Sequence, residues 1–462
     1  MKSNELGTEK ISKLIVQQGV PAAIGFMVMS FYMIVDTIFV GRWVGPMGIA
    51  AITVVLPIVF LIASVGMSIG IGGASIISRA LGADNEVLAQ RVFGNQITLN
   101  MSIATLFVVL GFFFEEPLLR LFGAQGDIMP PSKTYFRIMV MGIPFLSWAM
   151  MSNHIIRAQG FPRIAMNVML LPAILNLILD PIFIYGLEWG MQGAALATIL
   201  SYFLSAAYTL WFFVWGASDL RIRRANLALD WAIVKETAAL GFVTLARQGT
   251  FSLLAIILNT ALYNYGSEIY VSAYGIINRL MVFSLFPIMG ISQGFLPITS
   301  YNYGAKLYDR VREGIRKSIA YGTVIAIVIY AIILLARYPI IFIFTDNASI
   351  LEITPRALVI VFMATPIALI QLIGSAYYQA IGRPLPALLL TLTKQGFCLI
   401  PLLFILPQYW GVEGIWWAFP IADILSAFIT GYYLVKAYRQ LQGEEEVTVN
   451  LSSHLVEGER IE

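Results

Sequence analysis

The chain has 462 residues, of which 59% are hydrophobic and only 12% are charged. Soluble domains carry about 25% charged residues, so this composition excludes an ordinary soluble protein and is typical of a helical protein that crosses the membrane several times. The net charge of +3 and the scattered basic residues argue against a nucleic-acid partner, and the single cysteine, Cys398, excludes an intramolecular disulfide.

Polar loops rich in glycine and proline divide the chain into twelve apolar segments, each near the ~20 residues that one helical crossing requires. The predicted spans are 13–40, 49–78, 88–114, 130–157, 163–186, 190–215, 231–264, 270–303, 313–337, 351–380, 385–406 and 411–438. They form two predicted lobes, 13–215 and 231–438, joined by a cytoplasmic linker at 216–230. We expect a cytoplasmic N-terminus at 1–12 and a disordered acidic cytoplasmic tail at 439–462.

Lysine and arginine are distributed unequally between the two sets of loops. With a cytoplasmic N-terminus, 20 of the 29 basic residues lie in cytoplasmic segments and six in outer segments. Cytoplasmic loops of membrane proteins carry an excess of these residues. The sequence therefore predicts a multi-pass protein of a prokaryotic plasma membrane, with both termini in the cytoplasm.

The two halves of the chain repeat each other at a nearly constant spacing. Gly160 and Gly382 follow equivalent spans, and Gly82 and Gly304 end equivalent spans with the same separation along the chain. A GxxG pattern opens both the sixth and the twelfth span, at almost the same separation. Because each half has six spans, the repeats share one orientation. The predicted fold is an all-α polytopic membrane protein, with twelve transmembrane helices in two six-helix bundles related by a pseudo-two-fold axis along the membrane normal.

Carboxylates inside the spans are few, and each costs about 2.5–3.5 kcal/mol on insertion scales. Asp36 and Asp180 lie near the outer ends of the first and fifth spans, so both are expected at similar depth. Asn176 shares a helix face with Asp180, and Thr198 and Tyr32 lie at comparable depth. Oxygen ligands suit a hard cation such as Na⁺, and paired carboxylates also suit a proton site. Hydrogen bonding between helices explains Asn176, Thr198 and Tyr32 equally well.

Pro21 interrupts the first span and removes one backbone hydrogen bond from it. A helix can bend or straighten at such a position, although a static kink is an equal explanation. We expect Pro21 to be the point of flexure of this helix.

The second lobe lacks an equivalent acidic pair, because the position that corresponds to Asp180 in the repeat is Pro401. Its spans instead hold the basic residues Arg247, Arg279 and Lys394. The one acid there, Asp423, is best explained as the partner of Lys394 or Arg247 in a structural ion pair. The functional role of these four charged residues stays open.

These features resemble the MATE (multidrug and toxic compound extrusion) family over the whole chain except the tail. The similarity rests on the six-plus-six repeat, the first-span pattern Pro21…Tyr32…Asp36-Thr37…Gly41, the loop Arg157-Ala-Gln-Gly-Phe-Pro-Arg163 and the fifth-span pattern Asn176…Asp180-Pro181. The chain is most similar to the DinF-like branch. The NorM-like branch uses central acids in spans 7 and 10 for sodium, whereas here Glu236 and Glu352 lie near the span ends.

The resemblance implies export of amphipathic, often cationic drugs in exchange for inward H⁺ or Na⁺, without any other cofactor. It assigns the coupling-ion site, and a possible Na⁺ site, to Asp36, Asp180, Asn176 and Thr198. Tyr32 and Asn153 are expected to line the substrate cavity together with the two aspartates. The expected partners are small-molecule drugs and the lipid bilayer, and the expected state is a monomer.

Two functions other than export of drugs are compatible with a protein of this fold class. A lipid-linked oligosaccharide flippase of the same superfamily would need a strongly basic cavity. The three buried bases of the second lobe give only weak support for such a cavity. An intramembrane enzyme is disfavoured, because no Ser/His or His/Glu constellation is visible in the sequence. The chain is therefore predicted not to be an enzyme.

Overall fold

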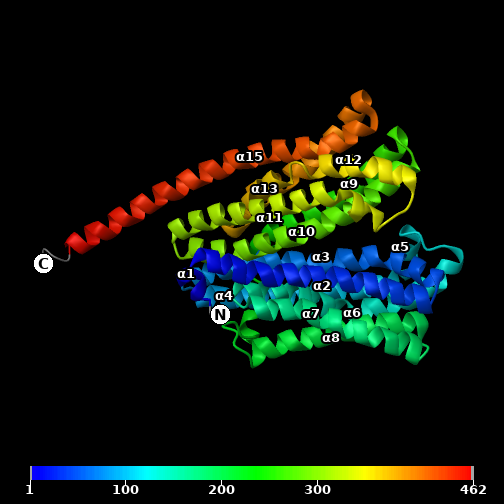
Figure 1. Cartoon of the computed structure of the whole chain (residues 1–462). Helices are drawn as coiled ribbons and strands as arrows, with labels where there is room; N and C mark the ends of the chain where they lie inside the picture. Colours follow the sequence, from blue (N-terminus) through cyan, green and yellow to red (C-terminus); the bar gives the residue numbers. More distant parts are fainter. Residues whose placement is uncertain (1–2, 459–462) are drawn as a thin grey trace. The chain divides into compact units, whose positions relative to one another are not determined.

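The computed structural model describes residues 3–458, with side chains to residue 443, and its regular elements in that range are all helical (Figure 1). The helices are α1 (Glu5–Thr8), α2 (Ile11–Trp43), α3 (Pro46–Gly82), α4 (Glu86–Phe113), α5 (Glu115–Leu121), α6 (Met129–Ala158), α7 (Pro162–Asp180), α8 (Gly190–Val214), α9 (Trp231–Tyr265), α10 (Glu268–Gly304), α11 (Tyr308–Phe342), α12 (Ala348–Phe362), α13 (Thr365–Ala380), α14 (Pro384–Leu392) and α15 (Ile400–Gly458). Short 3₁₀ turns form η1 (Gly126–Ile128) and η3 (Arg224–Asn226), and π-helical turns form η2 (Pro181–Gly186) and η4 (Thr393–Leu399). The predicted all-α class is confirmed.

Twelve crossings can be assigned among the described residues. Ten helical segments are long and apolar enough to span a membrane, and the pair α12 and α13, bent by 46°, supplies an eleventh. One of the ten, Pro384–Gly443, contains 60 residues and would be about 90 Å long as one helix, far more than the ~30 Å hydrocarbon core. It breaks at Gly411, where φ is 56° and ψ is −139°, so it makes two crossings.

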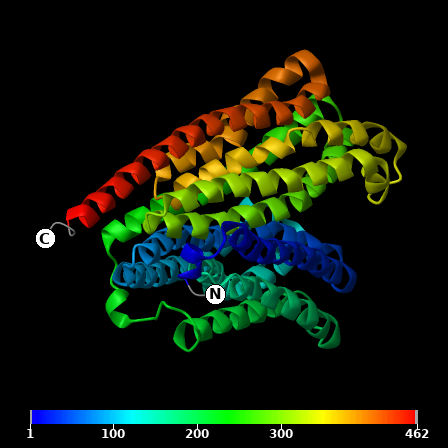
Figure 2. The same ribbon diagram turned by 60° about the vertical axis from the view of Figure 1, so that its left-hand side comes forward.

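The chain divides into two compact units. Unit 1 contains Pro21–Leu245, and unit 2 contains Asn4–Val20 and the chain from Ala246 onward. Inside unit 1, α6 packs against α3, α4 and α8, and these helices run side by side in Figures 1 and 2. Inside unit 2, α13 packs against α10, α11 and α15. The lobe bounds that the sequence suggests stay predictions.

The repeat in the sequence recurs inside each unit as the same hydrogen bond. In unit 1 the hydroxyl of Ser78 on α3 donates to the carbonyl oxygen of Ala158, at 3.1 Å, where α6 ends. In unit 2 the hydroxyl of Ser300 on α10 donates to the carbonyl oxygen of Ala380, at 3.0 Å, where α13 ends. Ser300 follows Ser78, and Ala380 follows Ala158, at the same separation along the chain that divides Gly160 from Gly382.

The two GxxG patterns have one structural cause, a close approach of backbones. A Cβ atom on Gly193 would lie 2.6 Å from the carbonyl oxygen of Phe183, and one on Gly414 would lie 2.5 Å from that of Leu406. Real Cβ atoms essentially never come within 3.0 Å of another heavy atom. Only glycine lets the sixth and twelfth spans begin directly against the end of the preceding span.

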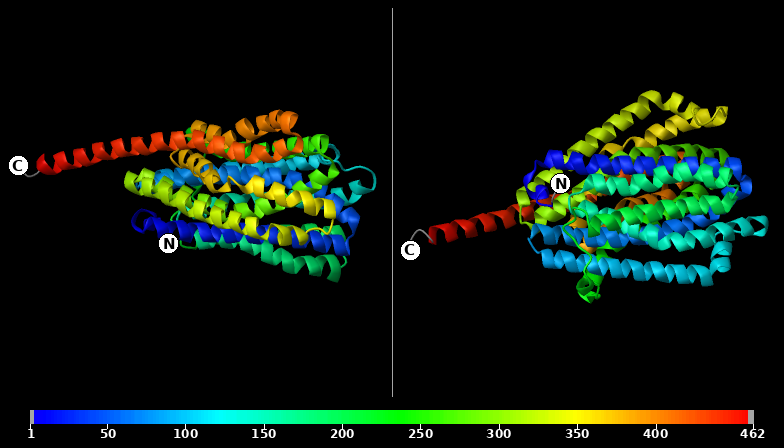
Figure 3. Two further views of the ribbon diagram at one scale, coloured as in Figure 1. Left: turned by 45° about the horizontal axis from the view of Figure 1, so that its top comes forward. Right: turned by 90° about the horizontal axis from the view of Figure 1, so that it is seen from below.

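The C-terminal part of the chain differs from the sequence prediction. Instead of a disordered tail over 439–462, α15 continues as a helix to Gly458, and its long ribbon is visible in Figure 3. The stretch has no proline, and its glutamates and leucines are good helix formers. Residues 459–462 lie outside the described part of the chain.

Candidate functional site

Asp180 ends α7 and is fully buried in unit 1, with 0% of its surface exposed. The π-helical turn η2 begins at the next residue, Pro181. Because proline has no backbone N–H, the helix cannot continue its regular hydrogen bonding there, and the chain widens into a π turn. The sequence pair Asp180-Pro181 thus sets a carboxylate at a break in the helix, away from water.

Asn176 connects Asp180 to α8. Its side-chain Nδ2 donates to Oδ1 of Asp180 and to Oγ1 of Thr198, each at 3.2 Å. The hydroxyl of Thr198 itself donates to the carbonyl oxygen of Ala194, at 3.0 Å. All three side chains of this cluster are buried. The structure therefore brings together three of the four residues assigned to the coupling-ion site.

Two oxygens of this cluster are buried without a hydrogen-bond donor in the described part of the chain: Oδ1 of Asn176 and Oδ2 of Asp180. A buried acceptor without a donor costs about 1–3 kcal/mol. Because the Asn176 amide nitrogen is engaged by its two acceptors, the amide oxygen is left free beside the carboxylate. A proton or a hard cation would satisfy both oxygens.

Asp36 joins the cluster from α2, where it is half-buried. Its side chain lies close enough to that of Asp180 for the two carboxyl groups to interact. One helical turn earlier on the same helix, the hydroxyl of Tyr32 lies 3.4 Å from the hydroxyl of Tyr202 on α8. The first, fifth and sixth spans thus meet through polar groups in one region of unit 1.

Two tyrosines of this region were not identified from the sequence. Tyr202 follows Thr198 by four residues, so a helix-face argument could have found it. Tyr135 on α6 is buried and lies close to Thr198. No sequence signal marked Tyr135, because a tyrosine near a span end is normally assigned to the aromatic belt at the membrane surface.

Asn153 lies away from the carboxylates. It is buried on α6, and its Nδ2 donates to the carbonyl oxygen of Ala165, at 2.6 Å. Ala165 is 15 residues before Asp180 on α7, which corresponds to roughly 22 Å along the helix axis. Asn153 therefore joins α6 to α7 in this structure, and its place in a substrate cavity stays a prediction.

Pro21 lies inside α2, which continues as a helix on both sides of it. It is 15 residues before Asp36, roughly 22 Å along the axis at 1.5 Å per residue. It is also the residue at which α2 passes from one compact unit to the other.

In unit 2, the ion pair expected for Asp423 is present. Lys394 in η4 lies with its Nζ 2.5 Å from Oδ1 of Asp423 on α15. Of the two bases that the sequence offered as partners, Lys394 is the one used. Over the described range, no group of three or more histidine, cysteine, aspartate or glutamate side chains lies together as a metal site.

Comparison with known proteins gives the family. The sequence pattern of the MatE family matches residues 21–182 and, a second time, residues 245–405. The chain belongs to the MATE family. The double match follows the internal repeat, and since the members of this family are transporters, the chain is a transporter rather than an enzyme, as predicted.

Multidrug export proteins of staphylococci are similar to this MATE protein along nearly their whole length. The multidrug export protein MepA of Staphylococcus saprophyticus is 28% identical over 408 residues, covering 88% of this chain and 90% of the relative. MepA of Staphylococcus aureus is 26% identical over 451 residues, covering 97% of both chains.

Solved structures of MATE transporters share the fold. A multidrug resistance MATE family transporter of the MOP superfamily, in an outward-facing conformation, superimposes with a TM-score of 0.90 at 24% identity. The alignment covers 96% of this chain and 99% of that one. The predicted twelve-helix architecture is therefore confirmed.

Proposed function

We propose that this MATE transporter exports amphipathic, cationic organic compounds in exchange for inward movement of H⁺ or Na⁺. Its staphylococcal relatives carry the name multidrug export protein. The site in unit 1 supplies negative charge inside an apolar helical bundle, which suits both an organic cation and a coupling ion. The absence of central acids in spans 7 and 10 supports an assignment to the DinF-like branch.

The contact between Asp36 and Asp180 is the observation that carries this proposal. Two carboxylates in contact repel each other strongly when both are ionised in a medium of low dielectric constant. A proton on one of the two groups removes this repulsion. The pair can therefore take up or release a single positive charge, which is what coupling to an ion gradient requires.

Sodium is the second candidate for the coupling ion. Asp36, Asp180 and Asn176 together offer carboxylate and amide oxygens, the ligand types that hard cations prefer. The Thr198 hydroxyl is engaged by its own neighbours here, so we assign it the task of orienting Asn176. No other cofactor is proposed.

The proposed cycle links this site to the shape of α2. The site holds either the coupling ion or the positive charge of a drug, but not both. Protonation of Asp36 from outside removes charge, changes its contact with Asp180 and favours bending of α2 near Pro21. The substrate cavity then contracts, and the drug leaves to the outside. Exchange follows because ion and drug differ in affinity between the two conformations.

We further propose that the protein works as a monomer in the plasma membrane of a bacterium, with both termini in the cytoplasm. The unequal distribution of basic residues supports the orientation. The bacterial origin of the similar export proteins supports the membrane.

Resistance of cells expressing Asp36→Asn tests the central role of the pair. Asparagine keeps the shape of the side chain but cannot exchange a proton, so resistance to a flat aromatic cation such as ethidium should fall to that of cells without the transporter. Asp346→Asn, an exposed aspartate in the loop before α12, is the matched control. Resistance equal to that of the unmodified protein, at equal expression, would overturn the proposal.

Proteoliposomes identify the coupling ion. Separately imposed pH and sodium gradients are applied, and ethidium movement is followed by fluorescence. Transport driven by only one gradient identifies H⁺ or Na⁺. If neither gradient drives ethidium and no ethidium gradient drives ion flux, drug antiport is refuted and the flippase alternative gains support.

A further inference from the structure

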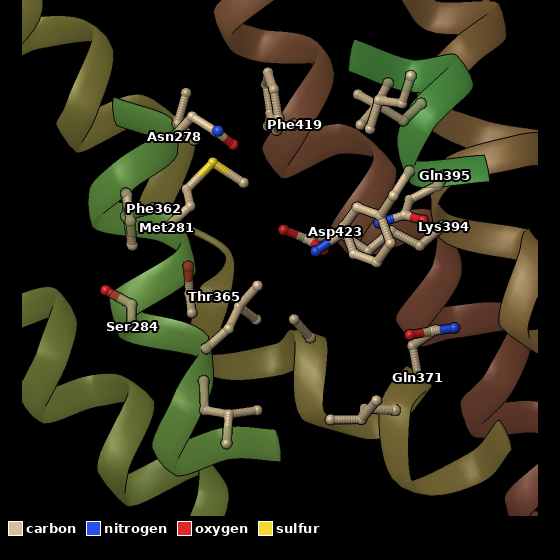
Figure 4. Close-up of a pocket in the computed structure, with 18 of the residues that line it drawn as sticks. Asn278, Met281, Ser284, Phe362, Thr365, Gln371, Lys394, Gln395, Phe419 and Asp423 are labelled. Carbon is tan, nitrogen blue, oxygen red and sulfur yellow. The ribbon is translucent and has the colours of Figure 1, made fainter. Parts of the chain in front are cut away.

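Unit 2 contains a cavity of about 190 Å³ that takes no part in the proposed exchange (Figure 4). It lies among α9, α10, α12, α13, α14, η4 and α15. Much of its wall is apolar or aromatic, for example Phe251, Met281 and Phe419. In Figure 4, Lys394 and Asp423 lie across the cavity from Asn278 and Met281. The cavity therefore combines an apolar wall with a charged end.

The charges around this cavity do not cancel. Lys394 is neutralised by Asp423, with 2.5 Å between Nζ and Oδ1. Arg247 also lines the cavity, but it has no ion pair or hydrogen bond within the described part of the chain. No other acidic side chain lines it. With all three groups ionised, one positive charge remains without a counter-charge inside the span that α9 forms.

An uncompensated arginine in a membrane helix is costly, so such a residue normally pairs with an acid or with a ligand. Guanidinium groups match carboxylates well, because their planar fork donates two parallel hydrogen bonds. Asn278 and Gln395 also line the cavity and add amide groups to its wall. A ligand with one negative charge would neutralise Arg247.

The rest of the wall limits what the ligand can be. Phe419 and Phe251 suit a flat apolar body, and Met281 adapts its shape to irregular partners. A second negative charge on the ligand would find no free base, because Lys394 already has its partner. An organic cation would be repelled by Arg247. Asp423, the one acid that lines the cavity, is already paired with Lys394.

We propose that this cavity binds a compact amphipathic organic monoanion, a carboxylate with an aromatic or aliphatic body, whose charge is held by Arg247. The site is distinct from the acidic cluster of unit 1, and it takes a ligand of the opposite charge. Its existence does not depend on the coupling ion or on export of cations.

Binding of 2-naphthoate tests this proposal. The purified full-length transporter is placed in nanodiscs of phosphatidylcholine, and isothermal titration calorimetry is corrected with empty nanodiscs. We expect saturable binding of 2-naphthoate and at least tenfold weaker binding of 2-naphthamide, its uncharged analogue, because a hydrogen bond to a charged group is worth about tenfold or more in affinity. Equal affinity for both compounds, or no saturable binding of 2-naphthoate, overturns the proposal.

Two substitutions of opposite expected effect locate the site. Arg247→Gln removes the free positive charge and should weaken 2-naphthoate binding about tenfold or more. Asp423→Asn releases Lys394 from its ion pair and should strengthen binding. Arg279→Gln, an exposed arginine on α10 outside the cavity wall, is the control and should leave affinity unchanged.

Size-exclusion profiles and melting temperatures establish that each variant is folded. If Arg247→Gln does not fold, the increase in 2-naphthoate affinity expected for Asp423→Asn still tests the proposal. Unchanged affinity in Asp423→Asn, or a loss in Arg279→Gln as large as that expected for Arg247→Gln, contradicts the assignment to this cavity.

Discussion

The side-chain amide of Asn176 donates to Oδ1 of Asp180 across 3.2 Å, one helical turn along α7. The same nitrogen reaches Oγ1 of Thr198 at 3.2 Å, so both of its protons have acceptors on two different helices. This arrangement fixes the amide with its oxygen unpaired beside the free carboxylate oxygen of Asp180. The two free oxygens form the part of the site that can accept a cation.

Asn176→Leu removes one of these oxygens while nearly keeping the volume of the side chain. We expect the apparent affinity for the coupling ion to fall about tenfold or more, as for other residues that ligate or orient a cation. Thr198→Val removes only one acceptor of the amide and should cost about fivefold, the equivalent of one hydrogen bond. The measurement is ethidium transport in proteoliposomes as a function of the driving ion concentration.

Asn167→Leu supplies the control on the same helix. Its amide donates to the hydroxyl of Tyr208, at 3.4 Å, and takes no part in the carboxylate cluster. An effect of Asn167→Leu on ion affinity equal to that of Asn176→Leu would show that the loss is a general consequence of changing α7.

Tyr32 and Tyr202 should behave as one unit, because their hydroxyls share a single contact of 3.4 Å between α2 and α8. Tyr32→Phe and Tyr202→Phe each remove that contact. Their effects on ethidium transport should be less than additive in the double variant, with a coupling of about 0.5–1 kcal/mol. Full additivity would contradict a shared interaction. Tyr208→Phe, combined with Tyr32→Phe, should be additive and serves as the comparison.

The main elements of this site could be predicted from the sequence because they depend on periodicity. Asn176 and Asp180 are four residues apart on one helix, and a period of 3.6 puts them on one face. The similar depth of Asp36 and Asp180 follows from their distances to the ends of their spans. Their direct contact needed the structure, since depth does not determine which helix faces which.

Other parts of the site were out of reach of sequence reasoning. Tyr135 touches Thr198 only because α6 packs against α8. Asn153, which is predicted to line the substrate cavity, donates its amide to the backbone of Ala165, a partner that the sequence does not indicate. Polar residues in a membrane helix form hydrogen bonds with whichever neighbouring helix packs against them. Their partners therefore cannot be predicted from sequence spacing alone.

The fold itself was easier to predict, because the loop glycines report on the backbone. Gly160 and Gly382 have φ values of 82° and 78°, in the left-handed region that glycine adopts without strain. Their separation along the chain thus marks the same turn in both halves. The end of α15 shows where this reasoning fails: a polar, acidic composition suggested disorder, whereas continuous helix propensity carries the backbone to Gly458.

The close approach at Gly193 predicts a loss of stability on substitution. A Cβ atom there would lie 2.6 Å from a backbone oxygen, which cannot rotate away. Gly193→Val should lower the free energy of unfolding by about 2–3 kcal/mol, the upper range for overpacking, and Gly414→Val should do the same. Thermal unfolding in detergent measures this.

Gly275 on α10 provides the matched control, because a Cβ atom there would meet nothing within 4 Å. Gly275→Ala should leave stability unchanged or raise it by up to about 1 kcal/mol, the gain from replacing glycine in a helix. A destabilisation by Gly275→Ala equal to that of Gly193→Val would mean that backbone contact is not the cause.

Glu116 on α5 links stability to pH outside the spans. Its carboxylate lies 2.7 Å from Nζ of Lys133 and 2.7 Å from Nη2 of Arg120, and these two cations hold the pKa of Glu116 at about 2, below its usual value of 4.5. A lowered pKa in the folded state adds stability that is present in full above pH 4.5 and is lost as pH falls toward 2. Glu116→Gln should therefore melt slightly below the unmodified protein at pH 7, and the difference should shrink below pH 4.5.

Salt provides an independent check on the same substitution. The Glu116 side chain is 44% exposed, so 1 M NaCl should also reduce the difference in melting temperature at pH 7. Glu352→Gln, at an exposed glutamate on α12 without an ion pair within residues 3–443, is the control for the loss of one surface carboxylate. A melting difference for Glu116→Gln that is the same at pH 7 and pH 3, and at low and high salt, would mean that the two cations do not act through the charge of this carboxylate.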